Sequence, residues 1–441
     1  MKPICFLLAY FLPLQLFAEG KQLTGQHTPS TSPALSPAEA QKVFSVPPGF
    51  AVRLFAAEPD VVNPVAMTWD ERGRLWVLEL YEYPLGAPAG QKGRDRIKIL
   101  EDTDNDGVAD KVTVWADGLN LATGFLLGNG GAYVGQAPDL LFLEDTNHDD
   151  VCDKRTVLLT GFGLQDRHEL LNGFTWGPDG QLYMTHGVFN KSVVHPPTSK
   201  ERGLQDASTS STESNVKRSE DRAPFEGGVE MSAAVARFDP RTKKFEIFAD
   251  GTSNPWGVDF DKYGNAFVSA CVIDHLFHMA AGGIYVRQGG VPENPYSYEL
   301  LPSIVDHKHH MAAYAGICIY QGDNFPEEYR GHVFFGNIHQ NAINHDRLIP
   351  NGSSFKAVAE KDFLTTSDGW FRPVSEQTGP DGALWIADWY DKYPCYQNAQ
   401  ADPEGVDRER GRIWRVVYTG KDKGKKIGSR GDAKMDLAKL K

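Results

Sequence analysis

Apolar and polar residues alternate along most of the chain, and aspartate and glycine mark the turns between the alternating runs. Four segments share one pattern: a strand-like run, a turn with Asp and Gly, and a strand centred on aromatic residues. They read NPVAMTWDERGRLWVLE, NGFTWGPDGQLYMTH, NPWGVDFDKYGNAFVSA and VSEQTGPDGALWIAD. Two fainter copies, TGFLLGNGGAYVGQ and AGICIYQGDNFPEEYRGHVFFGN, fit the same register. The pattern therefore predicts six β-hairpins.

These hairpins recur at intervals of about 60 residues, which indicates a repeat architecture. Two more strand-like runs follow the hairpins, so each repeat predicts four antiparallel strands. Six such units predict an all-β fold, a six-bladed β-propeller over residues 47–418. The longest interval contains residues 195–228, a polar, serine-rich stretch without periodicity that we expect to be a disordered insert.

The last unit contains only three strand-like runs, the third being GRIWRVVY at residues 411–418. A closed ring needs a fourth strand there, and the start of the chain offers FAVRLFAA at residues 50–57. We expect this N-terminal segment to be the outer strand of the final blade. A β-sandwich or two separate β domains are the alternatives.

The two ends of the chain differ from this repeat. The first 18 residues have a short charged start and an apolar run that ends at Ala18, a pattern typical of an export signal. The run is too short, and too broken by Pro3 and Pro13, for a stable membrane span. Residues 19–46 predict a flexible leader and residues 419–441 a basic tail. We therefore expect an exported protein, periplasmic or at the cell surface.

The net charge and the spacing of the cysteines limit which partners and cofactors we expect. The net charge of −13 argues against nucleic acid or an anionic membrane surface as the main partner. The cysteines after the signal are widely and irregularly spaced, without the CxxCH sequence that attaches haem and without zinc-finger spacing. No haem is expected on this chain. Buried free thiols and one unassignable disulfide both stay open for Cys152, Cys271, Cys318 and Cys395.

Two aspartate-rich loops, residues 100–111 and 143–154, have the spacing of a calcium loop. Oxygen-bearing side chains occupy positions 1, 3, 5 and 9, and position 6 is Gly107 in the first loop and Asp150 in the second. Both loops join the third strand of a predicted blade to the fourth, which places them on the bottom face. The alternative is an Asp-rich turn that only solvates a hairpin end. The expected structural Ca²⁺ ligands are Asp102, Asp104, Asp106, Asp110, Asp145, Asn147, Asp149 and Asp153.

On the top face, polar residues begin the inner strands or end the second strands of the predicted blades. A ring of polar groups at a channel mouth suits a ligand site, although propeller channels also carry such rings without chemistry. The rings comprise Asn63, Thr123, Asn172, Asn254, Glu79, Gln136, His186, Asn337 and Asp388, with His168, His309, His310 and Arg372 just upstream of inner strands.

Two mechanisms can be built from these residues. In one, Glu79, Asn172, Asn254 and Asp388 bind a divalent cation that activates water for lactone or ester hydrolysis. In the other, His168 is the general base that removes a hydroxyl proton, while Arg372 holds an anionic group of an organic cofactor. A non-catalytic propeller that binds carbohydrate or protein is the third alternative.

The motifs GRLWVLE, LEDTDNDGVADK, HELLNGFTWGPDGQLYMTHG and FRPVSEQTGPDGALWIADWYDK resemble the membrane-bound dehydrogenase domains of exported proteins from planctomycetes and verrucomicrobia. The resemblance covers residues 45 to about 418. That family is related to soluble quinoprotein glucose and sorbosone dehydrogenases, six-bladed propellers that bind pyrroloquinoline quinone and calcium. It implies a sugar or alcohol dehydrogenase, with His168 as the catalytic histidine and the polar ring around the cofactor.

Two departures from the family pattern qualify this expectation. Ser253-Asn254 stands where the quinoproteins carry Arg-Asn, so that a cofactor-contacting arginine is missing, and Arg372 could compensate for it. Many family members continue into helical repeats and a cytochrome c domain, whereas this chain stops at the basic tail. We therefore expect a small sugar or alcohol substrate and a separate electron acceptor, such as a cytochrome.

Overall fold

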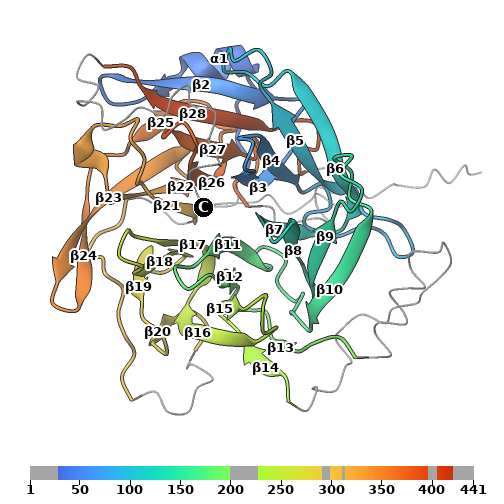
Figure 1. Cartoon of the computed structure of the whole chain (residues 1–441). Helices are drawn as coiled ribbons and strands as arrows, with labels where there is room; N and C mark the ends of the chain where they lie inside the picture. Colours follow the sequence, from blue (N-terminus) through green and yellow to red (C-terminus); the bar gives the residue numbers. More distant parts are fainter. Residues whose placement is uncertain (1–27, 199–226, 291–297, 310–312, 396–404, 421–441) are drawn as a thin grey trace, which may run out of the picture.

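The computed structural model describes residues 28–198, 227–290, 298–309, 313–395 and 405–420. The expected export signal, most of the expected insert and nearly all of the basic tail lie outside these residues. The described part is almost entirely β, and its sheets are arranged around a central axis as the six blades of a propeller (Figure 1). Among the described residues, no helix is long and apolar enough to cross a membrane.

Blades 1 and 2 are four-stranded antiparallel sheets, as the repeat predicts. Blade 1 contains β3 (Pro64–Trp69), β4 (Leu75–Glu79), β5 (Asp95–Glu101) and β6 (Lys111–Leu119). Blade 2 contains β7 (Ala122–Gly128), β8 (Gly131–Gln136), β9 (Asp139–Glu144) and β10 (Lys154–Thr160).

Blades 3 and 4 depart from the regular repeat. Blade 3 contains β11 (Asn172–Trp176), β12 (Leu182–His186), β15 (Ala234–Phe238) and β16 (Phe245–Thr252), and a hairpin of β13 (Ser192–Val194) and β14 (Val229–Met231) flanks the expected insert. Among the described residues, the blade 4 sheet consists of β17 (Asn254–Phe260), β18 (Ala266–Cys271) and β19 (Leu276–Met279). The next strand, β20 (Ile284–Arg287), pairs in parallel with β16 of blade 3 instead. The expectation of four antiparallel strands in every unit is therefore wrong for blade 4 within the described chain.

The N-terminal segment closes the ring. Blade 6 contains β26 (Pro373–Thr378), β27 (Leu384–Asp388), β28 (Arg412–Tyr418) and, as its outer strand, β2 (Phe50–Ala57). Strand β2 runs antiparallel to β28, from the pair Phe50 with Tyr418 to the pair Ala57 with Arg412. The predicted closure by residues 50–57 is confirmed, and in Figure 1 the blue β2 lies beside the red β28.

Blade 5 also receives a strand from the start of the chain. It contains β21 (Tyr314–Ile319), β22 (His332–Asn337), β23 (Ala342–Asn351), β24 (Ser354–Ala359), β25 (Leu364–Thr366) and the short β1 (Phe44–Ser45), with the 3-10 helix η3 (Glu327–Tyr329) between β21 and β22. Helix α1 (Pro37–Lys42) precedes β1 and starts with a capping box formed by Ser36 and Glu39. Part of the segment expected to be a flexible leader is therefore folded, and the ordered chain begins before residue 47.

The inner strands come close to one another around the axis because each has a bulge near its start. The register shifts in all six inner hairpins, for example between Asn172 and Thr175 and between Pro255 and Val258. Gly173 adopts φ 63° there, and a Cβ at this position would come 2.9 Å from the Cα of Gly257. The bulges therefore bring neighbouring blades into backbone contact around the channel.

Candidate functional site

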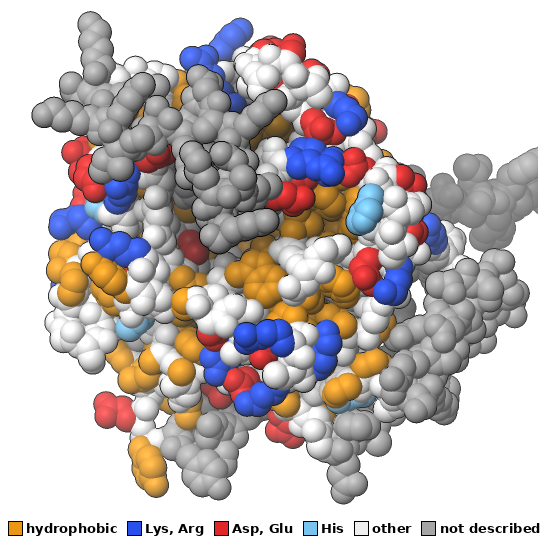
Figure 2. Space-filling view, in the orientation of Figure 1, with side chains coloured by type: hydrophobic (Ala, Val, Ile, Leu, Met, Phe, Trp, Pro, Cys, Tyr) orange, Lys and Arg blue, Asp and Glu red, His pale blue; other side chains and the backbone are white. Residues whose placement is uncertain are grey.

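One face of the propeller contains a cavity of about 490 Å³ at the central axis. Its walls come from blades 1, 3, 4, 5 and 6, mostly from the first residues of the inner strands, the last residues of the second strands and the segments next to them. The aspartate loops connect β5 to β6 and β9 to β10, at the opposite ends of the strands. The cavity thus lies on the face where the site was expected. Figure 2 shows hydrophobic side chains gathered around the central hollow.

His168 and Asp166 form a hydrogen-bonded pair at the edge of the cavity, on the segment before β11. Asp166 Oδ1 lies 3.0 Å from His168 Nδ1 and also accepts the backbone N–H of His168 at 2.9 Å. The buried Asn190 anchors this segment by donating to the carbonyl oxygens of Asp166 and Glu169. The same carboxylate therefore fixes both the backbone and the ring of His168.

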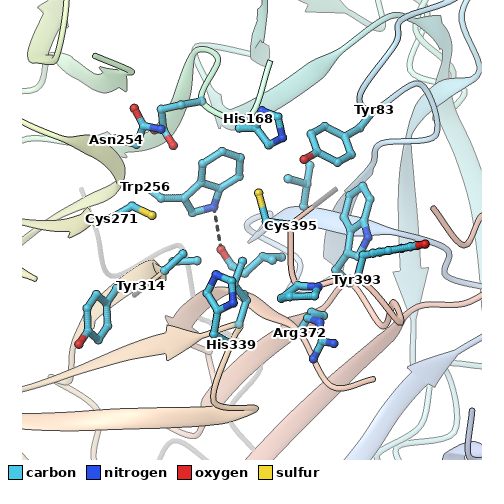
Figure 3. A pocket seen from close by; sticks show the side chains of 18 of the residues that line it. Tyr83, His168, Asn254, Trp256, Cys271, Tyr314, His339, Arg372, Tyr393 and Cys395 are labelled. Carbon is cyan, nitrogen blue, oxygen red and sulfur yellow. Dashed lines mark hydrogen bonds between the residues drawn. The ribbon is translucent and has the colours of Figure 1, made fainter. Parts of the chain in front are cut away.

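The thiol of Cys395 lies on the same side of the cavity as His168 and Tyr83 (Figure 3). Burial lowers the pKa of His168, but hydrogen bonds to Asp166 and Cys395 outweigh burial and raise the pKa to about 11. The raised pKa favours the protonated imidazole at neutral pH. Cys271 also lines the cavity, and burial raises the pKa of its thiol. No disulfide joins the four described cysteines.

Aromatic rings supply the flat surfaces of the cavity. Tyr83 packs edge-on against His168, with ring centroids 5.7 Å apart, and against Trp389 at 5.8 Å. Trp256 lies in the middle of the cavity and donates its Nε1 hydrogen to Val374 O at 3.0 Å (Figure 3). This bond joins blade 4 to blade 6 across the channel. Trp256 and Val374 also line a second cavity of about 380 Å³ between the inner strands, so they separate the two spaces.

Arg372 lies opposite His168 in this view of the cavity (Figure 3). Its Nη atoms donate to the backbone carbonyls of Phe371, Gly369 and Lys392, at 2.7 to 3.1 Å. Its Nε is buried and has no hydrogen-bond partner among the described residues. Burial lowers the pKa of this guanidinium to about 10.

Two buried carboxyl groups that we did not expect also line the cavity. Glu169 is 2% exposed and accepts a hydrogen bond from Asn172 Nδ2 at 2.7 Å, and burial raises its pKa well above the ordinary value. Burial likewise raises the pKa of Asp391 to about 6. The protein therefore favours the neutral form of Glu169 and weakens the acidity of Asp391.

Among the polar residues of the expected rings, Asn254 lines the cavity and accepts the N–H of Val188 at 3.1 Å. The other residues that we expected to contact a cofactor are buried outside the cavity lining, and each forms hydrogen bonds with other protein groups. Their partners are Lys98 for Glu79, Thr185 for Asn172, Glu169 for His186, Asn344 for Asn337 and Trp414 for Asp388. The oxygen set that would hold a catalytic cation is therefore not assembled, because Glu79 pairs with Lys98 at 2.8 Å and Asp388 accepts from Trp414 at 2.9 Å.

Some cavity residues carried little signal in the sequence. Asp166, two residues before His168, could have been found, because a carboxylate at that spacing can turn back onto the imidazole. Trp256 was visible only as one aromatic residue among many in the inner strands. Cys271 and Cys395 are far apart in the chain and line the same cavity only in the folded ring.

The first aspartate loop gathers three of its four expected ligands. Carboxylate oxygens of Asp102, Asp104 and Asp106 lie within 4.8 Å of one another. Asp110 instead accepts hydrogen bonds from the N–H and hydroxyl of Thr103.

The second loop repeats this arrangement. Asp153 caps Thr146 through both oxygens, and Asp145 accepts the N–H of Asp149 and of Asp150. Asn147 donates to Asp149 at 3.2 Å. Asp150 has φ 64°, the left-handed conformation that Gly107 adopts in the first loop.

The remaining histidine candidates lie elsewhere. His309 belongs to a buried cluster between blades 4 and 5, away from the cavity. His310 falls outside the described residues.

Solved structures share this propeller fold. A glucose dehydrogenase of Thermus thermophilus is similar with a TM-score of 0.53 and 16% identity, over 84% of this chain and 100% of that chain. A Trichoderma reesei carbohydrate-active enzyme of Family AA12 gives a TM-score of 0.52 and 12% identity, over 85% of this chain and 98% of that chain. At these identities the likeness shows the fold alone.

Sequence comparison shows the family. No curated protein matches the chain. A family model described as a domain of unknown function, DUF7133, matches residues 36–420, which include the whole propeller. The chain therefore belongs to the DUF7133 family.

Proposed function

We propose that the protein is a dehydrogenase of sugars or alcohols. It uses a flat quinone cofactor of the pyrroloquinoline quinone type in the upper cavity, the one lined by His168 and Arg372. The observation that carries the proposal is the His168–Asp166 pair at the edge of an aromatic-lined cavity of about 490 Å³. The resemblance to exported planctomycete dehydrogenase domains and the fold shared with a glucose dehydrogenase support it.

The donor set of the cavity fits such a cofactor. Tyr83, Trp256 and Trp389 offer faces and edges for a planar ring system. Arg372 presents a buried Nε with no hydrogen-bond partner among the described residues, so its guanidinium suits a carboxylate of the cofactor. At the position where the related quinoproteins have arginine, Ser253 is buried and donates to Gln288 at 2.5 Å. Arg372 is therefore the only arginine among the described lining residues.

Each residue then has a defined task. A bound quinone supplies an acceptor for the hydride of the substrate carbon. Asp166 holds His168 Nδ1, so in the neutral imidazole Nε2 is the atom that takes the hydroxyl proton. Trp256 closes the floor toward the inner channel and limits the entry of water. Asn254 and Glu169 offer hydrogen bonds to substrate hydroxyl groups.

Reconstitution with the quinone tests this proposal. The purified chain, titrated with pyrroloquinoline quinone, should show a bound chromophore and should reduce a dye when sugars or alcohols are added. His168→Ala should lower the rate about 100-fold or more. His278→Ala, outside the cavity on β19, should leave the rate unchanged. A chain that binds no quinone, or equal rates in both variants, would contradict the proposal.

The hydrogen bond between Cys395 and His168 favours a second candidate, a thiol-dependent hydrolase. In that reaction Cys395 is the nucleophile, His168 is the base and Asp166 orients His168. Cys395→Ala should then abolish ester or lactone hydrolysis, whereas dye reduction should survive it. The two functions are therefore separable in one variant.

We also propose that the aspartate loops bind structural calcium and that the protein is exported, with a separate electron acceptor. The clustered carboxylates of Asp102, Asp104 and Asp106 support the calcium site. A Trichoderma reesei enzyme of the same fold is described as a calcium structure, with a TM-score of 0.50 and 12% identity over 85% of this chain and 97% of that chain. The apolar start of the sequence supports export.

A further inference from the structure

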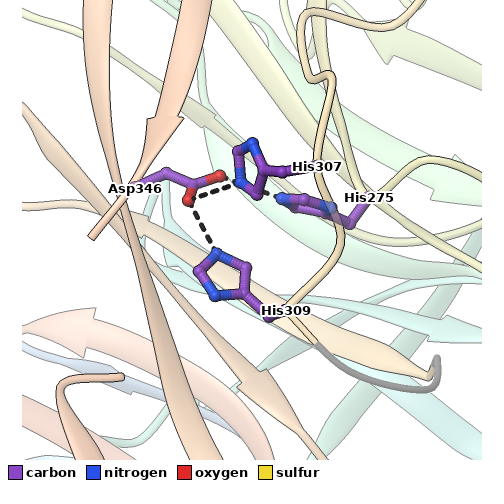
Figure 4. Close-up of side chains that lie close together, drawn as sticks. All are labelled: His275, His307, His309 and Asp346. Carbon is purple, nitrogen blue, oxygen red and sulfur yellow. Dashed lines mark hydrogen bonds and ion pairs between the residues drawn. The ribbon is translucent and has the colours of Figure 1, made fainter. Parts of the chain in front are cut away.

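Three imidazoles and one carboxylate meet between blades 4 and 5, outside the cavity (Figure 4). The Nε2 atoms of His307 and His309 lie 3.1 and 2.7 Å from Asp346 Oδ1. His275 Nε2 lies 2.9 Å from Asp346 Oδ2. The four donor groups lie within 4.8 Å of one another.

These residues come from three separate parts of the fold. His275 occupies the turn between β18 and β19 of blade 4, and Asp346 lies in β23 of blade 5. His307 and His309 lie on the connection from β20 to β21 and point toward the same carboxylate. Their convergence therefore requires the folded interface between the two blades.

The cluster is buried and has an outer layer of support. The side chains of His275 and Asp346 have 0% exposure, that of His309 has 4% and that of His307 has 18%. Asp362 Oδ1 lies 3.4 Å from His309 Nδ1 and accepts from Asn344 Nδ2 at 2.8 Å. A carboxylate behind a histidine is the usual outer partner of a metal-binding imidazole.

We infer that His275, His307, His309 and Asp346 bind one Zn²⁺ ion, or another divalent first-row metal that prefers nitrogen ligands. Three imidazoles and one carboxylate are a poor set for calcium or magnesium, which prefer oxygen. A tetrahedral zinc site with bonds of 2.0 to 2.1 Å separates its donors by about 3.3 Å. The histidine nitrogens lie 2.7 to 3.1 Å from the carboxylate oxygens, and all four donor atoms lie within 4.8 Å of one another, so the cluster is compact enough for its side chains to close around one ion.

Four protein ligands make this a closed, structural site, and its position suits that role. Within the described chain blade 4 has three strands in its sheet, and the metal joins the β18–β19 turn to β23 of the next blade. His275 packs on Tyr314, with ring centroids 4.8 Å apart, and Tyr314 lines the upper cavity. The ion therefore stabilises the blade 4 to blade 5 interface and one wall of the cavity.

Metal titration of the full chain tests the inference independently of any enzymatic activity. After treatment with a chelator, the protein should bind one equivalent of Zn²⁺ in calorimetry, with a rise in melting temperature. One equivalent of Co²⁺ should give the intense visible absorption of a tetrahedral site.

Matched variants make the test specific to this cluster. His307→Ala changes the most exposed ligand and should remove both the zinc heat and the cobalt absorption. Asp362→Asn keeps all four ligands and should weaken zinc binding about 10-fold. His278→Ala, a neighbouring histidine whose Nδ1 pairs with Ser354, should bind zinc like the wild type.

Two results would overturn the inference. Wild-type protein that takes up neither Zn²⁺ nor Co²⁺ would leave the cluster as a hydrogen-bonded array around Asp346. Equal zinc binding by wild type and His307→Ala would place the ion elsewhere.

Discussion

At the scale of single residues, His168 shows how a neighbouring carboxylate raises the pKa of an imidazole. Asp166 holds Nδ1 at 3.0 Å, and together with Cys395 it raises the pKa of His168 from 6.5 to about 11. A proton acceptor must be neutral before it can act. His168 is therefore a poor proton acceptor at neutral pH and a better one as the pH rises.

The raised pKa of His168 also makes folding stability depend on pH. The folded state binds a proton more tightly than the unfolded state, so His168 stabilises the fold fully below pH 6.5, and this stabilisation is lost as the pH rises to about 11. Asp166→Asn should lower this pKa by about 1–3 units and flatten the decline. Unfolding by denaturant at pH 7 and pH 10 measures the effect. Identical pH dependence in wild type and variant would contradict it.

In the reconstituted enzyme, the same substitution should move the rise of kcat/KM to lower pH, because that parameter follows the proton acceptor of the free enzyme.

At the scale of elements, each aspartate loop docks on the blade before its own. Ala109 N in the first loop donates to Phe55 O of blade 6, and Cys152 N in the second donates to Trp115 O of blade 1. An arginine reinforces the second contact, since Arg74 of blade 1 pairs with Asp150 at 2.8 Å. The loops therefore link neighbouring blades through backbone hydrogen bonds, with or without an ion.

A double-mutant cycle on Arg74 and Asp150 measures this contact. The two groups form two hydrogen bonds, and the Arg74 side chain is only 10% exposed. We expect a coupling energy of about 1.5 kcal/mol in the free energy of unfolding at pH 7. A coupling near zero would show that the pair adds nothing to the docking of the loop.

Calcium should add a separate stabilisation through the first loop. Calcium at 100 times its Kd should raise the free energy of unfolding by about 2.7 kcal/mol for one occupied site. Asp104→Asn keeps an oxygen that can accept the N–H of Asp106 but removes one charge, and should weaken the calcium response. Asp117→Asn, an exposed aspartate of the same blade paired with Lys92, is the control. Melting curves with and without calcium measure the rise in melting temperature of each variant. An equal rise in both variants would exclude this loop as the calcium site.

At the scale of the whole molecule, the sequence pattern was sufficient for the ring and insufficient for the site. Strand alternation and turn residues predicted the hairpins, the six blades and the closing strand, because these follow from local periodicity. The side-chain partners did not follow, because they come from distant segments. Lys98 neutralises Glu79, and Asp346 meets three histidines of other strands and loops, through contacts that exist only after the blades pack.

Closure by β2 makes the stability of the whole ring depend on one strand from the start of the chain. Phe50 on this strand packs edge-on against Phe325, Phe363 and Tyr418, with ring centroids 4.7 to 5.1 Å apart. Phe50→Ala should lower the free energy of unfolding by about 3–5 kcal/mol, because it leaves a cavity between blades 5 and 6. Arg53→Ala, at an exposed position of the same strand, should change it by less than about 0.5 kcal/mol. Denaturant unfolding measures both variants, and a loss below about 1 kcal/mol for Phe50→Ala would mean that the ring is held without its closing strand.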